Sequence, residues 1–429
     1  MRDIKFIYMY YIVLMIVTVV RTTETEPNAI IRIGYLLAFF MPIVLKYSEL
    51  FSVCLVSFMT VGTYSFAYSF FPYQLVIYPI ICLFTYIICK GGYGLSLTKN
   101  GALLFFSSIY VLLVDVLNGG SPQNIFYSLL LIIFFVLLKG GNATYNLSLM
   151  FNGFAATSLA LSIVYLSNYE KFVVSYGQGE FERSGWTDPN YLSSIIGMGI
   201  LTSFVQILRK RNAALPLKLF WIVCVGLSLI SQLLMASRGG ILATALSIVI
   251  VFMFTKIRSI YKVGVFVILC VFIFWLYNSG FFDLLEYRIL SDDGSGSGRT
   301  VIWVKKLNAF IEEGNPLQWI FGLGYESAFK LAGEGRLLGF HNDFLAILCG
   351  YGILGVSVFV YFIMIPLREA ASYAKPIVLS LIVYLMVVCA TLEPLSAGRL
   401  VFFYFLFLIY SCAYTSKRVS HEKSIICNT

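Results

Sequence analysis

Continuously apolar runs of about 20 residues recur along this chain from one end to the other, and runs of this length are typical of membrane-spanning helices. Of 429 residues, 59% are hydrophobic and only 12% are charged, whereas soluble proteins carry about 25% charged residues. The strands of a transmembrane barrel would alternate apolar with polar residues instead. The sequence therefore predicts an all-α integral membrane protein and excludes a soluble globular fold.

Hydropathy places fourteen candidate spans, and we expect 12 to 14 transmembrane helices. The candidates lie at residues 4–20, 29–45, 50–70, 74–89, 101–117, 123–138, 147–166, 190–208, 217–235, 239–255, 262–278, 341–365, 376–392 and 399–414.

Loop charges give the orientation, because cytoplasmic loops are rich in Lys and Arg. With both termini in the cytoplasm, the inner side holds 18 of the 30 basic residues and 4 of the 21 acidic residues. We expect six parts along the chain: N-terminal transmembrane helices at 1–166, a first outer loop at 167–189, central transmembrane helices at 190–278, a large outer loop at 279–340, C-terminal transmembrane helices at 341–414 and a cytoplasmic tail at 415–429.

The remaining composition argues against several classes of function. The net charge of +9 follows from this topology, so nucleic acid is not an expected partner. The nine Cys lie mostly in apolar runs without a CxxC pair, which is typical of buried small side chains and not of a zinc site. The only carboxylates that suit a metal, Asp188, Asp292 and Asp293, lie in turn or flexible contexts. We therefore expect no bound metal.

The large outer loop contains a predicted helix of its own. A flexible Gly/Ser-rich stretch at 292–298 precedes residues 299–313, where Val301, Val304, Leu307 and Ile311 recur at helical spacing. This pattern predicts an amphipathic helix that lies on the membrane or folds back to it. A loop with its own helix is typical of a lid or a substrate-positioning element.

Four of the ionisable residues on the predicted outer side stand out, because a charge near the bilayer is costly unless it is paired or used. They are Arg183, Arg238, Arg299 and His341. Each alone has a structural interpretation as a loop charge, an interfacial anchor or a helix cap. Together they favour a functional site. Arg forms a planar fork suited to pyrophosphate oxygens, and His, with an ordinary pKa of about 6.5, suits a general base.

The motifs around these residues resemble the superfamily of O-antigen ligases and Wzy-type polymerases. In chain order they are Asp188-Pro189-Asn190, Ser237-Arg238-Gly239-Gly240, Gly298-Arg299 followed by Trp303, Gly322-Leu323-Gly324, His341-Asn342 with Leu345, and Gly352-Ile353-Leu354-Gly355. The resemblance extends over about residues 183–356, whereas the first 166 residues are similar only as a series of spans.

This resemblance implies a GT-C-like enzyme of the bacterial inner membrane, with its active site on the periplasmic side. The implied donor is an undecaprenyl-pyrophosphate-linked glycan, and the implied reaction is metal-independent, inverting glycosyl transfer without a cofactor. By resemblance, His341 is the base or acceptor orienter, and Arg238, Arg299 and, third, Arg183 bind the pyrophosphate. The candidate helpers are Asn190, Asn342, Asp343 and Arg399.

Several activities remain open within this reading. An O-antigen polymerase, which extends a chain onto another lipid-linked repeat unit, is favoured by the Tyr- and Phe-rich composition and the Gly/Ser-rich approach to Arg299. A ligase that transfers the chain to lipid A core and a capsule or exopolysaccharide polymerase use the same chemistry. A lipid-linked glycan flippase and a structural assembly protein are alternatives from other classes, although no two-half symmetry typical of transporters is visible. Expected partners are the lipid-linked donor and acceptor, membrane lipids and a candidate chain-length regulator.

Overall fold

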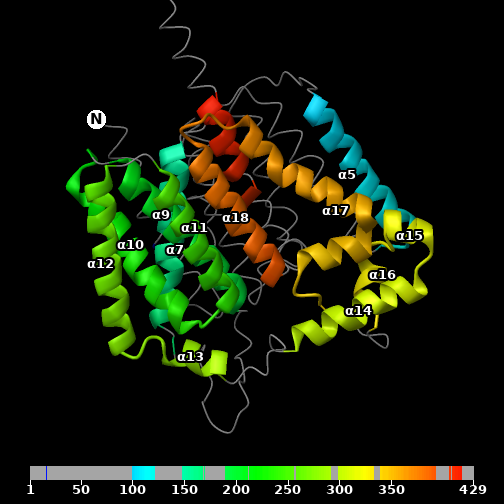
Figure 1. The fold of residues 1–429 in the computed structure, drawn as a ribbon, viewed down its shortest axis with the longest axis horizontal. Helices are drawn as coiled ribbons and strands as arrows, with labels where there is room; N and C mark the ends of the chain where they lie inside the picture. Colours follow the sequence, from blue (N-terminus) through cyan, green and yellow to red (C-terminus); the bar gives the residue numbers. More distant parts are fainter. Residues whose placement is uncertain are drawn as a thin grey trace, which may run out of the picture. The chain divides into compact units, whose positions relative to one another are not determined.

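The structure is a computed structural model of the chain (Figure 1). It describes residues 99–120, 147–167, 189–210, 212–255, 258–290, 298–332, 339–392 and 408–417, together with Ile16, Tyr169, Phe405 and Leu406. Every regular element within these ranges is a helix. Five predicted spans, at 4–20, 29–45, 50–70, 74–89 and 123–138, lie outside the described ranges, so the total of fourteen stays a prediction.

The described helices belong to two compact units. Unit 1 contains α7 (Leu147–Ser167), α9 (Pro189–Arg209), α10 (Leu215–Leu234), α11 (Arg238–Phe254), α12 (Ser259–Asn278) and most of α13 (Asp283–Leu290). Unit 2 contains α5 (Lys99–Leu117), α14 (Arg299–Glu313), α15 (Pro316–Phe321), α16 (Tyr325–Lys330), α17 (Asp343–Glu369), α18 (Lys375–Thr391) and the helical residues 408–417.

Five of these helices, α7, α9, α10, α12 and α17, are long and apolar enough to cross a membrane. Two shorter apolar helices, α11 and α18, accompany them. A helix suits an apolar run in lipid because it satisfies its backbone hydrogen bonds internally. The helices begin close to where hydropathy starts the spans, and α9, α10 and α18 carry a proline in the first turn, where the missing N–H costs nothing.

In unit 1, α9 packs against α7, α10 and α11, and buried small polar residues take part in the packing together with apolar ones. Gly199 of α9 faces Ser158 of α7 so closely that a larger residue would collide. The Ser158 hydroxyl lies 2.9 Å from the Ser228 hydroxyl of α10 and donates to the Ile196 carbonyl at 3.0 Å. Small side chains and hydroxyl hydrogen bonds are how helices associate in lipid, where apolar burial gives little preference for a protein neighbour.

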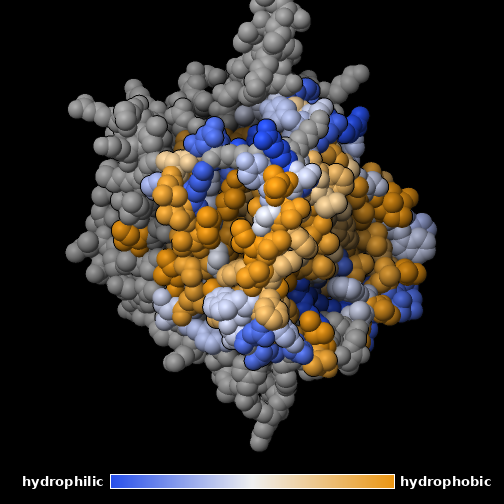
Figure 2. Space-filling model, turned by 60° about the vertical axis from the view of Figure 1, so that its left-hand side comes forward, coloured by the Kyte–Doolittle hydropathy of each residue, from blue (hydrophilic) through white to orange (hydrophobic). Residues whose placement is uncertain are grey.

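Helix α12, unlike α9, is exposed along most of its length. Leu276 is its only buried residue, whereas Val263, Phe266, Ile268 and Phe274 are exposed. Figure 2, in which the side carrying α12 comes forward, shows hydrophobic residues over much of the described surface. A helix that is apolar on its exposed faces is stable only in an apolar surrounding, which supports a membrane protein.

In unit 2, α17 has a kink at Gly352, and the segment Gly322-Leu323-Gly324 packs against this kink. Gly352 has φ 64° and ψ −170° inside the helix. The carbonyls of Cys349 and Gly350 accept from the backbone N–H groups of Leu323 and Gly324 at 3.0 and 2.9 Å. The Gly322-Leu323-Gly324 motif therefore serves as the backbone partner of the kink and supplies hydrogen bonds that the break removes.

Candidate functional site

His341 lies immediately before α17 in a backbone conformation that is unusual for a residue with a side chain. Its φ is 49°, a left-handed conformation that costs on the order of 1–3 kcal/mol and persists only when neighbours enforce it. The next residue, Asn342, caps α17: its Oδ1 accepts from the N–H groups of Phe344 and Leu345 at 3.0 and 3.2 Å. Asn342 was predicted as a helper residue of the site, and the structure shows that its side chain caps α17.

Asp343 is the first residue of α17 and is fully buried. Its carboxylate forms a side-chain hydrogen bond with the thiol of Cys389 in α18. A carboxylate at a helix N-terminus is favoured by the helix dipole, and the contact with Cys389 joins the start of α17 to the end of α18. Asp343 therefore helps to hold the start of α17, next to His341, against α18.

Arg299 is the first residue of α14 and also reaches the end of α18. Its Nη1 donates to the carbonyl of Thr391 at 2.6 Å. The carbonyls at a helix C-terminus carry partial negative charge, so a guanidinium is stabilised there. Arg299 and Asp343 consequently meet the same terminal turn of α18, at Thr391 and Cys389.

The helix predicted over 299–313 is present as α14, and the face that packs against the rest of unit 2 is not its apolar stripe. Val301, Val304 and Ile311 are exposed, whereas Lys306 and Phe310 are buried. The exposed apolar stripe agrees with a helix that lies on the membrane, while aromatic rings and carbonyls of unit 2 surround the lysine on the other side.

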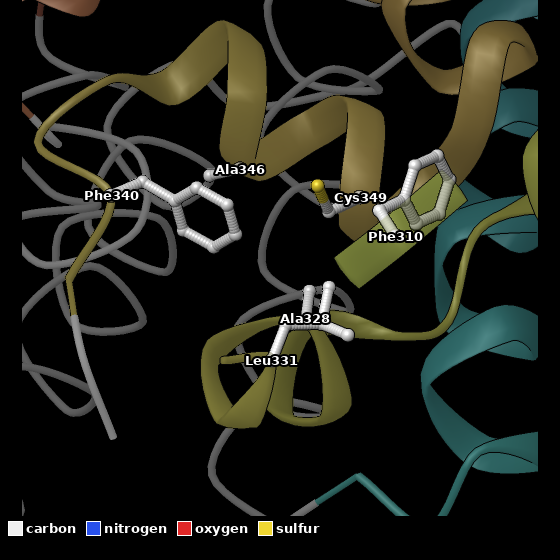
Figure 3. Packing of buried hydrophobic residues seen from close by; sticks show 6 residues of the cluster. All are labelled: Phe310, Ala328, Leu331, Phe340, Ala346 and Cys349. Atoms are coloured by element: carbon white, nitrogen blue, oxygen red, sulfur yellow. The ribbon is translucent and has the colours of Figure 1, made fainter. Parts of the chain in front are cut away.

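Phe310 belongs to a small core together with residues of α16 and α17. Figure 3 shows this cluster, which consists of Phe310, Ala328, Leu331, Phe340, Ala346 and Cys349. Phe340, the residue before His341, is fully buried in it. The residues on either side of His341 are thus anchored, one by the core and the other by the α17 cap.

Arg238 lies in unit 1, as the first residue of α11. It follows a turn in which Ala236 has φ 47° and Ser237 is the N-cap residue. Beneath this turn, Gln232 of α10 donates through Nε2 to the Ser193 carbonyl of α9 at 3.1 Å and to the Thr244 hydroxyl of α11 at 3.0 Å. Gln232 therefore ties together the three helices that carry the Arg238 turn.

The predicted site residues thus divide between the units. Unit 2 brings Arg299, His341, Asn342 and Asp343 to the meeting point of α14, α17 and α18, and unit 1 carries Arg238 and buried Asn190. Arg183 and Arg399 lie outside the described residues. Among the residues that the structure describes, no group of three or more His, Cys, Asp or Glu side chains is placed to hold a metal ion.

Sequence reasoning missed two buried charged residues of unit 2. Lys306 was not singled out, because lysine is rarely buried and no sequence signal identified it. Asp115 carried a signal: it is a single carboxylate within the apolar stretch 111–117, and an ionisable residue inside a span calls for an explanation. Its partners are the Tyr351 hydroxyl and the Tyr325 N–H.

Part of the chain matches a known protein family. Residues 223–360 match the family described as O-antigen ligase. The segment begins in α10 and ends in α17, and it contains Arg238, Arg299 and His341. The predicted resemblance to the O-antigen ligase and Wzy-type polymerase superfamily is confirmed over this segment. No curated protein matches the chain.

Proposed function

From the O-antigen ligase segment at residues 223–360, we propose that this protein is an O-antigen polymerase. It transfers an undecaprenyl-pyrophosphate-linked glycan onto a hydroxyl of another lipid-linked repeat unit at the periplasmic face of the bacterial inner membrane. The observation that carries the proposal is the position of Arg238, Arg299 and His341 within this single family segment. The arrangement in unit 2 supports it, because Arg299 begins α14 and His341 precedes α17, and both helices reach the end of α18.

The proposed chemistry is a direct displacement at the anomeric carbon. His341 accepts the proton of the acceptor hydroxyl as its oxygen attacks. The bond between the anomeric carbon and the pyrophosphate oxygen breaks, and the glycosidic bond forms on the opposite face with inversion. Arg238, Arg299 and Arg183 stabilise the charge that develops on the departing pyrophosphate, which is the task that electrostatic catalysis requires. Neither a metal nor another cofactor takes part.

Helix geometry favours a functional role for both described arginines. Arg238 and Arg299 are each the first residue of a helix, where a cation faces the positive end of the helix dipole. The same N-terminal N–H groups attract anions. An arginine at this position weakens its own helix but strengthens an anion site, which is the balance expected for a pyrophosphate-binding residue.

An O-antigen ligase is the second candidate, and the description of the matching family favours it. The two activities differ in their acceptor. A strain that lacks this protein should carry single repeat units on lipid A core if the protein is a polymerase. Loss of every repeat unit from the core would instead identify a ligase.

A reconstituted assay tests the chemistry. The purified chain in lipid nanodiscs is incubated with lipid-linked repeat units, and chain growth is followed by gel electrophoresis and mass spectrometry. His341→Ala should abolish growth, whereas His421→Ala, which changes the other of the two histidines, should leave it intact. Unchanged growth in His341→Ala removes that residue from the mechanism. Movement of lipid-linked units across the bilayer without chain growth identifies a flippase instead.

A further inference from the structure

His341 is held from one side by helix α14. The indole Nε1 of Trp303 donates to the carbonyl of Phe340 at 2.6 Å. That carbonyl and the N–H of His341 belong to one planar peptide group, so a bond to the carbonyl fixes the plane from which His341 continues. The left-handed φ of 49° at His341 is a conformation that requires such outside support.

Lys306, one helical turn further along α14, holds the side chain of the same phenylalanine. Its Nζ lies 4.1 Å from the centre of the Phe340 ring and 5.4 Å from that of Phe329. It also donates to the carbonyls of Phe329 and Ala328 in α16, at 3.0 and 3.4 Å. Only 1% of the lysine is exposed. A desolvated cation over an aromatic face is a strong contact of its kind.

Residues 299, 303 and 306 therefore form one row on α14, at helical spacing. Arg299 contacts the end of α18, Trp303 contacts the backbone before His341, and Lys306 contacts the ring before His341. One rigid helix thus sets the places of a proposed donor-binding residue and of the proposed base.

We infer that Trp303 and Lys306 are positioning residues that hold His341 in its left-handed conformation, so that α14 couples the position of the base to that of Arg299. This inference rests on the proposed function for its catalytic meaning. Its structural content, the dependence of His341 on two side chains of α14, is independent of any activity.

A spectroscopic test takes advantage of the two histidines in the chain. The full chain is labelled with ¹³C,¹⁵N-histidine in nanodiscs, and His421→Gln assigns the two signals. Trp303→Phe keeps an aromatic ring but removes the N–H donor, and it should shift the signal and the titration midpoint of His341 while those of His421 stay constant.

The matched control is Trp319→Phe. The Trp319 indole also donates to a phenylalanine carbonyl in unit 2, that of Phe310 at 3.3 Å, but this carbonyl does not belong to the peptide group that precedes His341. This variant should leave the His341 signal in place. The inference is overturned if Trp303→Phe leaves the His341 signal unchanged, or if both variants move it equally.

Lys306→Met and Lys305→Met form a second pair on adjacent residues, one buried and one exposed. Methionine keeps an unbranched stem and removes the charge. Lys306→Met should move the His341 signal and Lys305→Met should not. Should Lys306→Met fail to fold, the Trp303→Phe result still decides.

Activity gives the last readout. If His341 is misplaced in Trp303→Phe, kcat should fall by about 10- to 100-fold, because displacements of about 1 Å have effects of that size, while the KM for the donor stays near that of the parent protein. A histidine shift without any loss of kcat would support the positioning contact but contradict the catalytic role of His341. An unchanged signal would contradict the positioning contact, whatever the activity.

Discussion

The hydroxyl of Tyr351 lies within hydrogen-bonding distance of both carboxylate oxygens of Asp115, at 3.2 and 3.1 Å, although 236 positions separate the two residues. The N–H of Tyr325 donates to the same carboxylate at 3.1 Å. Helices α5, α16 and α17 thus meet at one fully buried carboxylate. A buried carboxylate is tolerated only when its hydrogen bonds are made, so this contact fixes α5 on unit 2.

Tyr351→Phe should destabilise unit 2. The change removes the hydroxyl and leaves Asp115 buried with fewer donors, which costs about 1–3 kcal/mol of the free energy of unfolding. Thermal unfolding in detergent measures it. The control is Tyr373→Phe in the same unit, since Tyr373 is exposed and its hydroxyl donates to the Ser416 carbonyl and not to a buried carboxylate. Equal losses in the two variants would contradict a special role for the Asp115 contact.

A glycine series separates backbone strain from close packing in unit 2. Gly322 and Gly298 both have positive φ, 86° and 79°. A Cβ at Gly322 would collide with the backbone of Gly350 and Tyr351, whereas a Cβ at Gly298 would meet nothing within 4 Å. Gly298→Ala should therefore lose about 1 kcal/mol through strain, and Gly322→Ala should lose clearly more or fail to fold.

Gly264→Ala, in α12 of unit 1, is the control without either effect, because Gly264 has ordinary helical φ and open space around it. It should be neutral or stabilising by about 0.5–1 kcal/mol. Expression yield and unfolding temperature rank the three variants. A loss in Gly322→Ala no larger than in Gly298→Ala would show that the motif does not need its close approach to α17.

The helices could be predicted from the sequence because their cause is local. Apolar runs place α9, α10 and α17 near their observed bounds, and the 299–313 pattern gives α14. The arrangement of side chains could not be predicted in the same way. The inward turn of Lys306 depends on Phe329 and Phe340, and the contact between Arg299 and Thr391 joins segments 92 residues apart. Such contacts are set by tertiary packing, which periodicity does not contain.

The role of the motif Gly322-Leu323-Gly324 also could not be predicted from the sequence. Gly322-Leu323-Gly324 was identified by resemblance alone, and its function as the backbone partner of the α17 kink appears only when Leu323 is seen to donate to Cys349. Conversely, the position of Asn342 as the cap of α17 agrees with an ordinary local signal, an asparagine directly before a helix.

Gln232 and Gln206 are two buried glutamines of unit 1 that should have different effects. Gln232 binds Ser193 and Thr244 below the Arg238 turn, and its Oε1 has no hydrogen-bond partner among the described residues. Because an unpaired buried acceptor is costly, Gln232→Leu loses two bonds but also removes an unsatisfied atom. We expect little change in the free energy of unfolding, and a transfer rate lowered by about tenfold through displacement of Arg238.

Gln206→Leu is the matched variant. Its Nε2 contacts the Ser148 carbonyl, the Ser148 hydroxyl and Asn152 Oδ1 at 3.0, 2.9 and 3.2 Å. Loss of these bonds between α9 and α7 should lower the free energy of unfolding by about 1–2 kcal/mol and leave transfer by the folded fraction unaltered. Unfolding curves and rates normalised to folded protein give both values. The opposite ranking would place Gln232 in the packing and not in the support of Arg238.

Arg299 allows its contact with α18 to be separated from its proposed contact with the donor. Arg299→Lys keeps the charge and loses the planar fork, whereas Arg299→Gln keeps N–H donors for the Thr391 carbonyl and loses the charge. If Arg299 stabilises the departing pyrophosphate, Arg299→Gln should lower kcat by about 100- to 1,000-fold. Arg299→Lys should lie between Arg299→Gln and the parent protein, because the charge remains and the bidentate fork is lost. If the contact with Thr391 is its whole task, Arg299→Gln should retain activity and stability at least as well as Arg299→Lys. Comparing kcat, donor KM and unfolding temperature in both variants decides between these outcomes.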